Sequence, residues 1–584
     1  MEKRLLLAIV LMMGVVLLVN LLFPPQRPGP GAVGTDTTAA VTEGGPAGRG
    51  TTAAPGTTAA PETTATQPLP ARPGETGRPE FALPSPVERP AAPAETVWVR
   101  APLYRLGFVE QGARLVSAEL LKFESLAPGT NGRPVQLVRP GSPDFLTHRW
   151  VVGDDTLDLR SARFEVDPPG GLTVQPGDST RTLTFTYRHP ESDFTLRVRY
   201  RFRADRYIVG LQGELGGVPG TGWWLLGMGD GLLSNEWNPE QDYKANLSYE
   251  ALGPDGLKSK KLTDVGPGQQ VTLDGPFQWV AVRTKYFVAA AVATGTAGQE
   301  GRFAGLRVEG LSEPYRARGA ASFPVGRDGH FDYQVYLGPQ DYGRLTAAGH
   351  DLDEVMPYGY KWLQPVLRPL VGAIIGLLVW THRMLAVNYG WILILFGIAI
   401  RVLLFPLYQK SMRSQLSTMR VQPLMKEIQS KYKNDPQRLQ QEMMKLYREH
   451  KINPLGGCLP MLLPWPILIA LFFVFRDTIE FRGVPFLWLP DLSQPDPYYI
   501  IPVVMGVSVF LLQWIGQRSM PQSNPQMKIM MWVMPVFLTV LFLNFAAGLN
   551  LYYATMNLAS IPQQLYLAKE RQAMASSTPA RAKT

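Results

Sequence analysis

One arginine lies inside a long apolar stretch of the chain, where a full positive charge is costly. Residues 389–408 carry no charge other than Arg401, and twenty residues at the rise of an α-helix extend about 30 Å, the thickness of a bilayer's hydrocarbon core. A charged side chain near the middle of a spanning helix costs about 3 kcal/mol, so it needs a compensating environment. One explanation is that the side chain snorkels to the nearer interface. The other is that its charge is met by water, carbonyls, lipid head groups or an incoming ligand, which makes Arg401 a candidate functional residue.

Other polar side chains recur at spacings of three and four near the C-terminus and so draw one stripe along a predicted helix. They are Asn550, Tyr553, Asn557, Ser560 and Gln564. Gln513 is a further polar group near the inner end of its predicted span, and any one of these groups could simply hydrogen-bond between helices. None of the five C-terminal spans contains Asp or Glu, so the sequence offers Arg401 no carboxylate within the membrane. The whole set predicts a hydrated, positively charged cavity in the inner leaflet.

Six membrane-spanning helices position these side chains. The predicted spans are an N-terminal anchor over residues 1–23 and helices over 389–408, about 455–475, 498–516, 527–544 and 548–567. The anchor follows Lys3 and Arg4 and has no cleavage site, which predicts an uncleaved anchor with a cytoplasmic N-terminus. Residues 409–451 hold ten Lys and Arg against four acidic residues, which places them in the cytoplasm together with the basic tail, residues 571–584.

The part of the chain before these C-terminal spans is predicted to be exported. Residues 24–96 are rich in Pro, Gly, Ala and Thr and predict a disordered linker. Residues 97–345, here called the β-domain, predict an all-β sandwich, with alternating apolar residues on either side of a turn at His189 and Pro190. The single cysteine, Cys458, excludes a disulfide framework.

Little in the sequence predicts catalysis or metal binding. The spacing of four histidines matches no metal site and instead predicts scattered surface residues; they are His148, His189, His330 and His350. There is no P-loop, no H-E-x-x-H and no G-x-S-x-G sequence. We therefore expect no cofactor, no metal and no ATP-driven or hydrolytic mechanism.

Two further helical segments flank the first C-terminal span. Residues 357–387 have an apolar core of only about eleven residues, which predicts an interfacial amphipathic helix. Residues 409–451, here called the cytoplasmic hairpin, predict two helices with Asp435 and Pro436 between them as cap and helix start. The methionines of the hairpin could be ordinary packing or an adaptable surface for apolar partners.

These features alone leave ion transport, solute translocation and peptide passage open. One alternative is therefore a polytopic transporter or channel with a tethered carbohydrate-binding β-domain. The basic, Met-bearing hairpin and the lack of paired intramembrane acids distinguish the chain from coupled transporters.

Several motifs resemble those of the YidC-type membrane protein insertases. They are Phe405-Pro406-Leu407 after Arg401, Gln440 to Tyr447 in the hairpin, Asn453-Pro454-Leu455-Gly456-Gly457, Asp496-Pro497-Tyr498-Tyr499, and Gly548 to Tyr553 with Asn557. The N-terminal anchor and the β-domain look like the Gram-negative version of the family. The resemblance implies an insertase core over residues 388–570, in a bacterial inner membrane, with both termini cytoplasmic and the β-domain periplasmic.

The resemblance also implies a function and its partners. The protein would insert and fold nascent membrane proteins, alone or with the Sec translocon, in contact with the lipid bilayer and without catalysing a reaction. Arg401, Gln513, Asn550, Tyr553 and Asn557 would line a substrate groove. Met419, Met443, Met444 and Lys445 of the hairpin, with the basic tail, would contact ribosomes or targeting factors.

Overall fold

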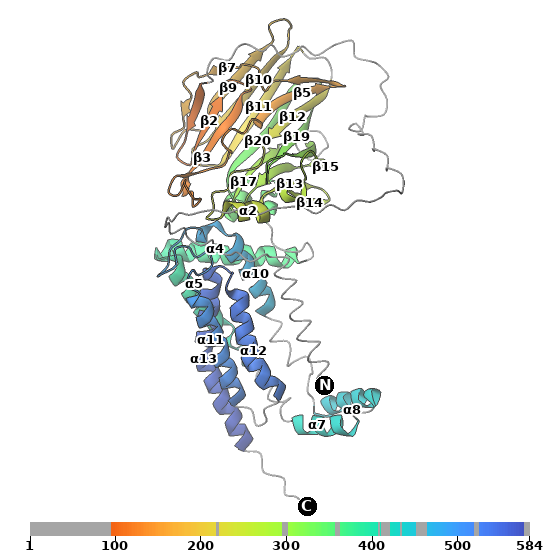
Figure 1. Ribbon diagram of the computed structural model, residues 1–584, viewed down its shortest axis with the longest axis vertical. Helices are drawn as coiled ribbons and strands as arrows, with labels where there is room; N and C mark the ends of the chain where they lie inside the picture. Colours follow the sequence, from red (N-terminus) through yellow and green to blue (C-terminus); the bar gives the residue numbers. More distant parts are fainter. Residues whose placement is uncertain are drawn as a thin grey trace, which may run out of the picture. The chain divides into compact units, whose positions relative to one another are not determined.

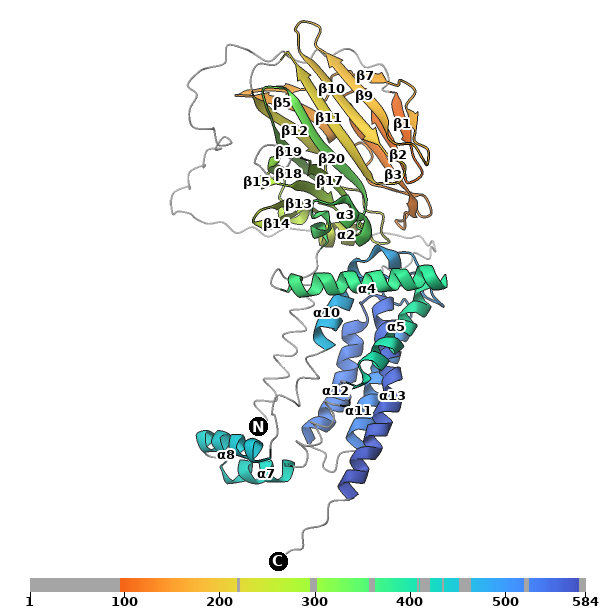
Figure 2. The ribbon, with the colours of Figure 1, turned by 180° about the vertical axis from the view of Figure 1, so that it is seen from behind.

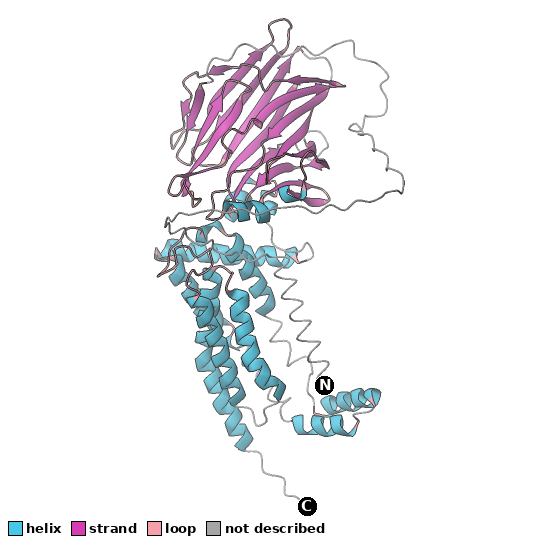
Figure 3. Cartoon of the chain, in the orientation of Figure 1, coloured by secondary structure: helices cyan, strands magenta, loops and turns pink. Residues whose placement is uncertain are grey.

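The structure is a computed structural model. It describes residues 95–217, 221–294, 302–356, 363–406, 409, 421–432, 435–450, 464–518 and 525–576. The anchor predicted over residues 1–23, most of the predicted linker and Cys458 lie outside the described residues. Figure 3 separates the described chain into a part made of strands and a part made of helices.

Three sheets form the β-domain. The five-stranded sheet has the order β4 (Pro134–Gln136), β3 (Arg114–Glu124), β2 (Tyr104–Val109), β1 (Thr96–Arg100), β8 (Leu172–Thr173). The nine-stranded sheet has the order β14 (Gly256–Lys261), β13 (Ser248–Gly253), β16 (Trp279–Arg283), β17 (Phe287–Ala293), β20 (His330–Pro339), β11 (Ile208–Gly216), β10 (Thr195–Phe202), β9 (Arg181–Arg188), β7 (Glu165–Asp167). The six-stranded sheet has the order β15 (Gln270–Phe277), β18 (Phe303–Gly310), β19 (Ala317–Val325), β12 (Gly222–Met228), β5 (Phe145–Val152), β6 (Asp155–Asp158).

One face of the nine-stranded sheet packs against both smaller sheets (Figure 1). The Tyr200 ring of β10 lies 4.9 Å from the Phe108 ring of β2, and its hydroxyl lies 3.3 Å from Nε2 of His148 on β5. The Trp224 ring of β12 stacks 4.3 Å from the Phe331 ring of β20. Because one tyrosine contacts both neighbouring sheets, the two smaller sheets share one aromatic core. The all-β sandwich predicted from the sequence is therefore present.

The hairpin predicted around His189 and Pro190 is confirmed. Strands β9 and β10 pair antiparallel, with Tyr187 opposite Leu196 and Phe185 opposite Val198. The apolar members of both strands are buried while their neighbours are not, because a period of two places alternate side chains on opposite faces of a sheet. Local alternation was enough to predict both strands and the face of each that is buried.

Short helical segments complete the β-domain and the connection that follows it. They are α2 (Pro239–Asn246), α3 (Tyr342–Ala348), η1 (Leu262–Asp264) and η2 (Leu352–Val355). Helix α2 begins where the side chain of Asn238 accepts a hydrogen bond from the backbone N–H of Gln241, the arrangement expected of an N-cap.

The helical part contains longer apolar helices. They are α4 (Gln364–Leu385), α5 (Tyr389–Leu403), α10 (Pro464–Asp477), α11 (Ile500–Arg518), α12 (Pro525–Phe542) and α13 (Ala547–Ser576), with η4 (Ile479–Phe481) after α10. Helix α13 continues to Ser576, well past the end at residue 567 that hydropathy predicts. It therefore carries part of the predicted basic tail as helix.

The predicted number of six spans is larger than the described helices show. By length and composition, two of them could cross a membrane, Gln364–Leu385 and Ile500–Gln517, and Tyr389–Leu403 and Met531–Phe542 are shorter apolar helices. The first of these two is α4, whose 22 residues exceed the apolar core of about eleven on which the interfacial prediction depended. Figures 1 and 2 both show α4 lying across α11 and α13 rather than along them.

Two helices lie in residues 409–451, α7 (Gln422–Lys431) and α8 (Pro436–Glu449), as the sequence predicts; the cytoplasmic location of this segment stays a prediction. Asp435 caps α8, since its side chain accepts from the backbone N–H of Arg438 at 3.1 Å, and Pro436 occupies the first helical position. Val421 and Leu446 are buried between the two helices. The cap and the proline were enough to place this turn from the sequence.

Candidate functional site

A cavity of about 480 Å³ has two walls. One wall is formed by α5 and the residues that follow it, and the other by α13. The cavity is lined by Arg401, Val402, Phe405, Gln409, Ala559, Pro562, Gln563 and Tyr566. The polar groups of this lining are a guanidinium, two side-chain amides and a phenol, all of which can donate hydrogen bonds. The other four lining residues are apolar, so the polar side of the cavity suits an acceptor with negative charge, such as a carboxylate, next to an apolar wall. Here it is called the cavity.

The packing of α5 against α13 turns Arg401 toward the cavity. Gly397 lies one helical turn before Arg401, hence on the same face, and a Cβ there would lie 3.3 Å from Cγ2 of Thr555. The glycine thus lets the two backbones approach closely. Phe396 adds a ring contact of 5.7 Å with Tyr552. Arg401 is 8 % exposed, so this helix pair places a nearly buried guanidinium at the cavity wall.

Gln563 is the most buried amide of the cavity wall. It is 7 % exposed, and neither Oε1 nor Nε2 has a hydrogen-bond partner among the residues that the structure describes. The preceding Pro562 has no N–H, so the carbonyl of Leu558 one turn earlier lacks its helical donor. An amide buried without a partner costs about 1–3 kcal/mol, which a bound guest or water in the cavity can recover.

The other residues predicted for the groove do not appear in this lining. Asn550 is fully buried and donates to the carbonyls of Phe542 and Phe545 at 3.0 and 3.4 Å, where it ties the end of α12 to the start of α13. Asn557 donates to Oγ of Ser508 on α11 at 3.1 Å. These contacts fit the interhelical role that was the alternative from sequence. Whether either residue meets a substrate stays a prediction.

Tyr553 and Gln513 are both half-buried. The ring of Tyr553 lies 5.4 Å from the ring of Phe542, so its ring packs between α13 and α12. Gln513 lies on α11, one of the helices that α13 contacts. Their assignment to a substrate groove also stays a prediction.

The predicted partner-binding residues of the hairpin fall on α8 or outside the described chain. Met444 and Lys445 are exposed and Met443 is half-buried, while Met419 lies outside the described residues. Met444 and Lys445 thus place an apolar and a basic side chain next to each other on the exposed surface of α8.

Sequence reasoning missed Gln409, Gln563 and Tyr566 as cavity residues. A spacing of four continues the polar stripe from Ser560 to Gln564, although a spacing of three reaches Gln563 equally well. The proline at position 562, which disturbs the helix there, was the available signal.

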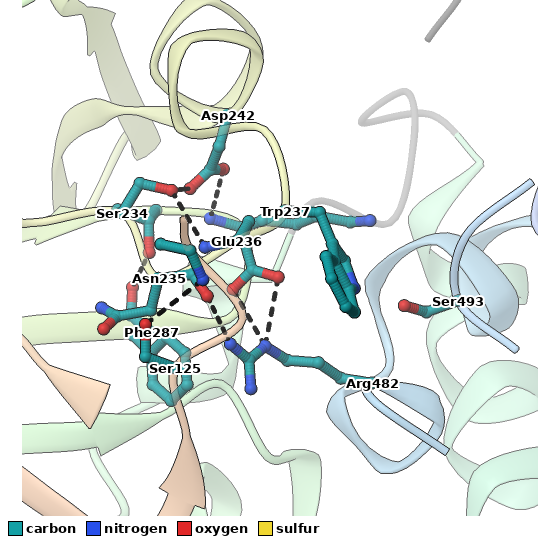
Figure 4. Close-up of polar contacts among 12 residues, drawn as sticks. Ser125, Ser234, Asn235, Glu236, Trp237, Asp242, Phe287, Arg482 and Ser493 are labelled. Atoms are coloured by element: carbon teal, nitrogen blue, oxygen red, sulfur yellow. Dashed lines mark hydrogen bonds and ion pairs between the residues drawn. The ribbon is translucent and has the colours of Figure 1, made fainter. Parts of the chain in front are cut away.

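The buried side chain of another arginine, Arg482, lies at a contact between the β-domain and the segment that follows α10 (Figure 4). The side chain of Arg482 is 4 % exposed and that of Glu236 is 7 % exposed. Nε of Arg482 donates to both carboxylate oxygens of Glu236 at 2.9 and 3.1 Å. Its two terminal nitrogens donate to the carbonyls of Glu124 at 2.8 Å and Asn235 at 2.7 Å.

Two effects act on the carboxyl group of this ion pair. Burial raises the pKa of Glu236 to about 7, although the charge of Arg482 opposes the rise. Burial also raises the pKa of the nearby Asp242, which accepts from the hydroxyl of Ser234 at 2.6 Å. This part of the β-domain is therefore a dry, acidic pocket filled by a guanidinium.

The prediction of surface histidines is wrong for two of the four. His148 is fully buried and stacks 5.1 Å from the Trp224 ring, and burial lowers its pKa to about 3. His189 is also buried, whereas His330 is exposed and His350 is half-buried. Among the described residues, no group of three or more His, Cys, Asp and Glu side chains could hold a metal ion.

Known proteins resemble the chain over most of its length. The family model described as "60Kd inner membrane protein" matches residues 380–574, and the one described as "YidC periplasmic domain" matches residues 96–373. The membrane protein insertase YidC of Chlorobaculum parvum is 34% identical over 488 residues, which are 80% of this chain and 81% of the relative. That of Syntrophus aciditrophicus is 32% identical over 599 residues, 98% of this chain and 100% of the relative.

A solved structure, YidC from Thermotoga maritima, aligns with 80% of this chain and 99% of its own at 14% identity and a TM-score of 0.30. A score of this size is too low to compare the arrangement of helices, so the assignment depends on the sequence relatives and the two family models. The chain belongs to the YidC family of inner membrane protein insertases and carries the periplasmic domain of that family.

Proposed function

We propose that the protein inserts membrane proteins by receiving the acidic, polar end of a client in the cavity beside Arg401. The observation that supports this most directly is the nearly buried guanidinium at the wall of a 480 Å³ cavity between two apolar helices. A fixed positive charge lowers the cost of bringing a carboxylate into a low-dielectric region. The cavity also shortens the apolar path that a polar tail must cross.

The apolar segment of the client would then leave sideways into lipid. Burial of apolar surface supplies about 25 cal/mol per Å², so a spanning segment provides its own driving force. Helices α5 and α12 expose large apolar side chains that are not part of the cavity lining, among them Leu395, Leu403, Trp532 and Val536. Such a surface is compatible with contact to lipid. No nucleotide or catalysed reaction is part of this mechanism.

The topology follows the prediction from charge. We place the β-domain and the segment after α10 in the periplasm and the hairpin and both termini in the cytoplasm, with six spans and α4 at the interface. The contact of Arg482 with Glu236 supports this, because it requires the segment after α10 and the β-domain to lie on the same side of the membrane. Cooperation with the Sec translocon, and binding of ribosomes or targeting factors by α8 and the tail, belong to the same proposal.

Insertion into protein-containing vesicles tests the role of Arg401. The client is a short membrane protein with one acidic residue in its translocated tail, and the matched client carries Asn in place of that Asp. Arg401→Ala should lower the insertion rate of the acidic client about tenfold, about 1.4 kcal/mol, and affect the neutral client much less. Arg401→Lys should retain most of the activity.

Two results would contradict the proposal. Equal loss for the acidic and the neutral client would show that Arg401 acts on structure rather than on charge. Unchanged insertion of both clients would remove the arginine from the mechanism. Solute or ion flux through the same vesicles that disappears with Arg401→Ala would favour a channel instead.

A further inference from the structure

The segment between α10 and α11 forms hydrogen bonds with the first residues of three helices, α5, α11 and α13. The connecting loop, residues 478–499 between α10 and α11, accepts at the carbonyl of Pro485 a hydrogen bond of 2.8 Å from Nδ2 of Asn388, the N-cap of α5. Its carbonyls of Gln494 and Leu492 accept from the backbone N–H groups of Ala547 at 2.7 Å and Gly548 at 2.9 Å. Helices α5 and α13 are the two that line the cavity.

The same loop also caps α11. The carboxylate of Asp496 is fully buried and accepts from the backbone N–H groups of Tyr498 at 3.0 Å and Ile501 at 2.8 Å. It accepts a further bond of 3.2 Å from Nε1 of Trp488 within the loop. Because the first turn of a helix has unsatisfied N–H groups, this carboxylate fixes where α11 begins.

Apolar packing joins the loop to α5 as closely as the hydrogen bonds do. Phe486 is 4 % exposed, and a Cβ at Gly390 would overlap its ring, so the glycine is required for the contact. Phe481 lies 5.4 Å from the ring of Tyr389. The start of α5 therefore cannot move without moving the loop.

The β-domain holds this loop through Arg482. Its five N–H donors form a planar fork, and the ion pair with Glu236 and the carbonyls of Glu124 and Asn235 use every nitrogen of it. The guanidinium also lies 5.3 Å from the ring of Phe287 (Figure 4). A second bond joins Nε1 of Trp237 to Oδ2 of Asp491 at 3.2 Å. A lysine could satisfy only part of this pocket.

We propose that the connecting loop is a positioning element for the cavity and that the β-domain, by binding Arg482, holds the loop in place. Helices are stiff, so a displacement at Asn388 is transmitted along α5 to Arg401, which lies about 20 Å away by helical rise. Loss of the Arg482 contact then loosens the spacing between α5 and α13. Arg482 acts through the helices and does not touch the client.

The experiment measures the spacing itself in the full-length protein in lipid. With Cys458→Ser as background, spin labels are placed at Val402 on α5 and Ala559 on α13, both in the cavity wall. Arg482→Met and Glu236→Gln should broaden the label-to-label distance distribution and shift it to longer values, and Arg482→Lys should lie between these variants and the parent. The matched control is Glu165→Gln, which removes an exposed ion pair with Arg188 on the same domain.

Insertion by the unlabelled variants gives a second readout. This readout depends on the proposed function, whereas the distance measurement does not. Arg482→Met should slow acidic and neutral clients alike, in contrast to Arg401→Ala. Hydrogen exchange shows whether residues 482–486 have become unprotected. If they have and the distance distribution is unchanged, the positioning role is overturned, whatever the insertion result. If Arg482→Met fails to fold, the milder Glu236→Gln decides the question by the same two measurements.

Discussion

Arg401 and Arg482 are both nearly buried, and their surroundings differ in kind. Arg482 fills a pocket of the β-domain in which a carboxylate and two carbonyls accept from it. Arg401 lies at the wall of a cavity of about 480 Å³ that also presents the amides of Gln409 and Gln563. One guanidinium completes a packed contact, and the other faces space that a guest can enter.

The difference in surroundings indicates two different roles for a buried arginine, one structural and one in binding. A buried ion pair is costly to break, because removal of one partner leaves the other uncompensated in a dry site. Such a contact resists exchange and suits a structural role. A buried charge beside a cavity can instead meet different partners in turn, as the proposed insertion of different clients requires. If the two arginines separate in this way, substitution of Arg482 should act on the loop contact and substitution of Arg401 on the client.

The largest effect is expected from Arg482→Ala. This substitution leaves Glu236 buried without its partner, so the free energy of opening the connecting loop should fall by about 3 kcal/mol. Hydrogen exchange of the loop amides in the full-length protein measures it. Replacing both partners, Arg482→Met with Glu236→Leu, should restore much of the loss, since no charge is then stranded. A double variant as unprotected as the single one would contradict this explanation.

A dependence on pH should accompany the same contact. Burial raises the pKa of Glu236 from its ordinary 4.5 to about 7 in the docked state, so docking takes up a proton between these two pH values. Stability of the docked loop is then greatest below about pH 4.5 and is lost as the pH rises to about 7. Protection of the loop amides, corrected for intrinsic exchange, should fall over that interval and level off above it.

Glu480 in the same loop should contribute in the same direction. Burial raises its pKa to about 7, with Asp341 adding to the rise and Arg344 and Arg383 opposing it. Glu236→Gln should therefore remove part of the pH dependence, and Glu236→Gln with Glu480→Gln nearly all of it. A dependence unchanged in the double variant would assign the titration to other groups.

A smaller effect on stability is expected at the other arginine. Arg401→Ala should lower insertion of an acidic client about tenfold, about 1.4 kcal/mol, while leaving loop protection within about 0.5 kcal/mol of the parent. The reason is that the cavity already provides room for the change and no buried carboxylate is stranded among the described residues of its lining. Loss of loop protection as large as that of Arg482→Ala would erase the distinction between the two sites.

The sequence predicted those features that local pattern determines. Alternation predicted the hairpin of β9 and β10 with one buried face, and Asp435 with Pro436 predicted the turn between α7 and α8. It also marked Arg401, since a charge in an apolar run is visible without a structure. The contact between Arg482 and Glu236 could not be predicted from local pattern, because the two residues are 246 positions apart in the sequence.

Other features depended on what surrounds a residue in space. Asn550 and Gln563 both belong to polar positions of α13, yet one bonds to the end of α12 and the other lines the cavity. His148 looks like any surface histidine in sequence but stacks on Trp224 in the core. Helical or strand spacing assigns a face to a residue, whereas the neighbours of that face come from tertiary packing.

The smallest effect on insertion is expected from substitution of Gln563, and it tests whether the amide of the cavity wall contributes to binding the client. Gln563→Leu keeps most of the volume and removes the amide, so insertion of an acidic client should fall about fivefold, about 1 kcal/mol, the typical net value of one intramolecular hydrogen bond. Gln563→Glu should be more severe, because a fixed carboxylate competes with the client for Arg401. The neighbouring Gln564→Leu is the matched control, since Gln564 is not among the residues that line the cavity. Equal effects at positions 563 and 564 would mean that the loss reflects the helix rather than the cavity, and the acceptor site would then consist of Arg401 without its neighbouring amide.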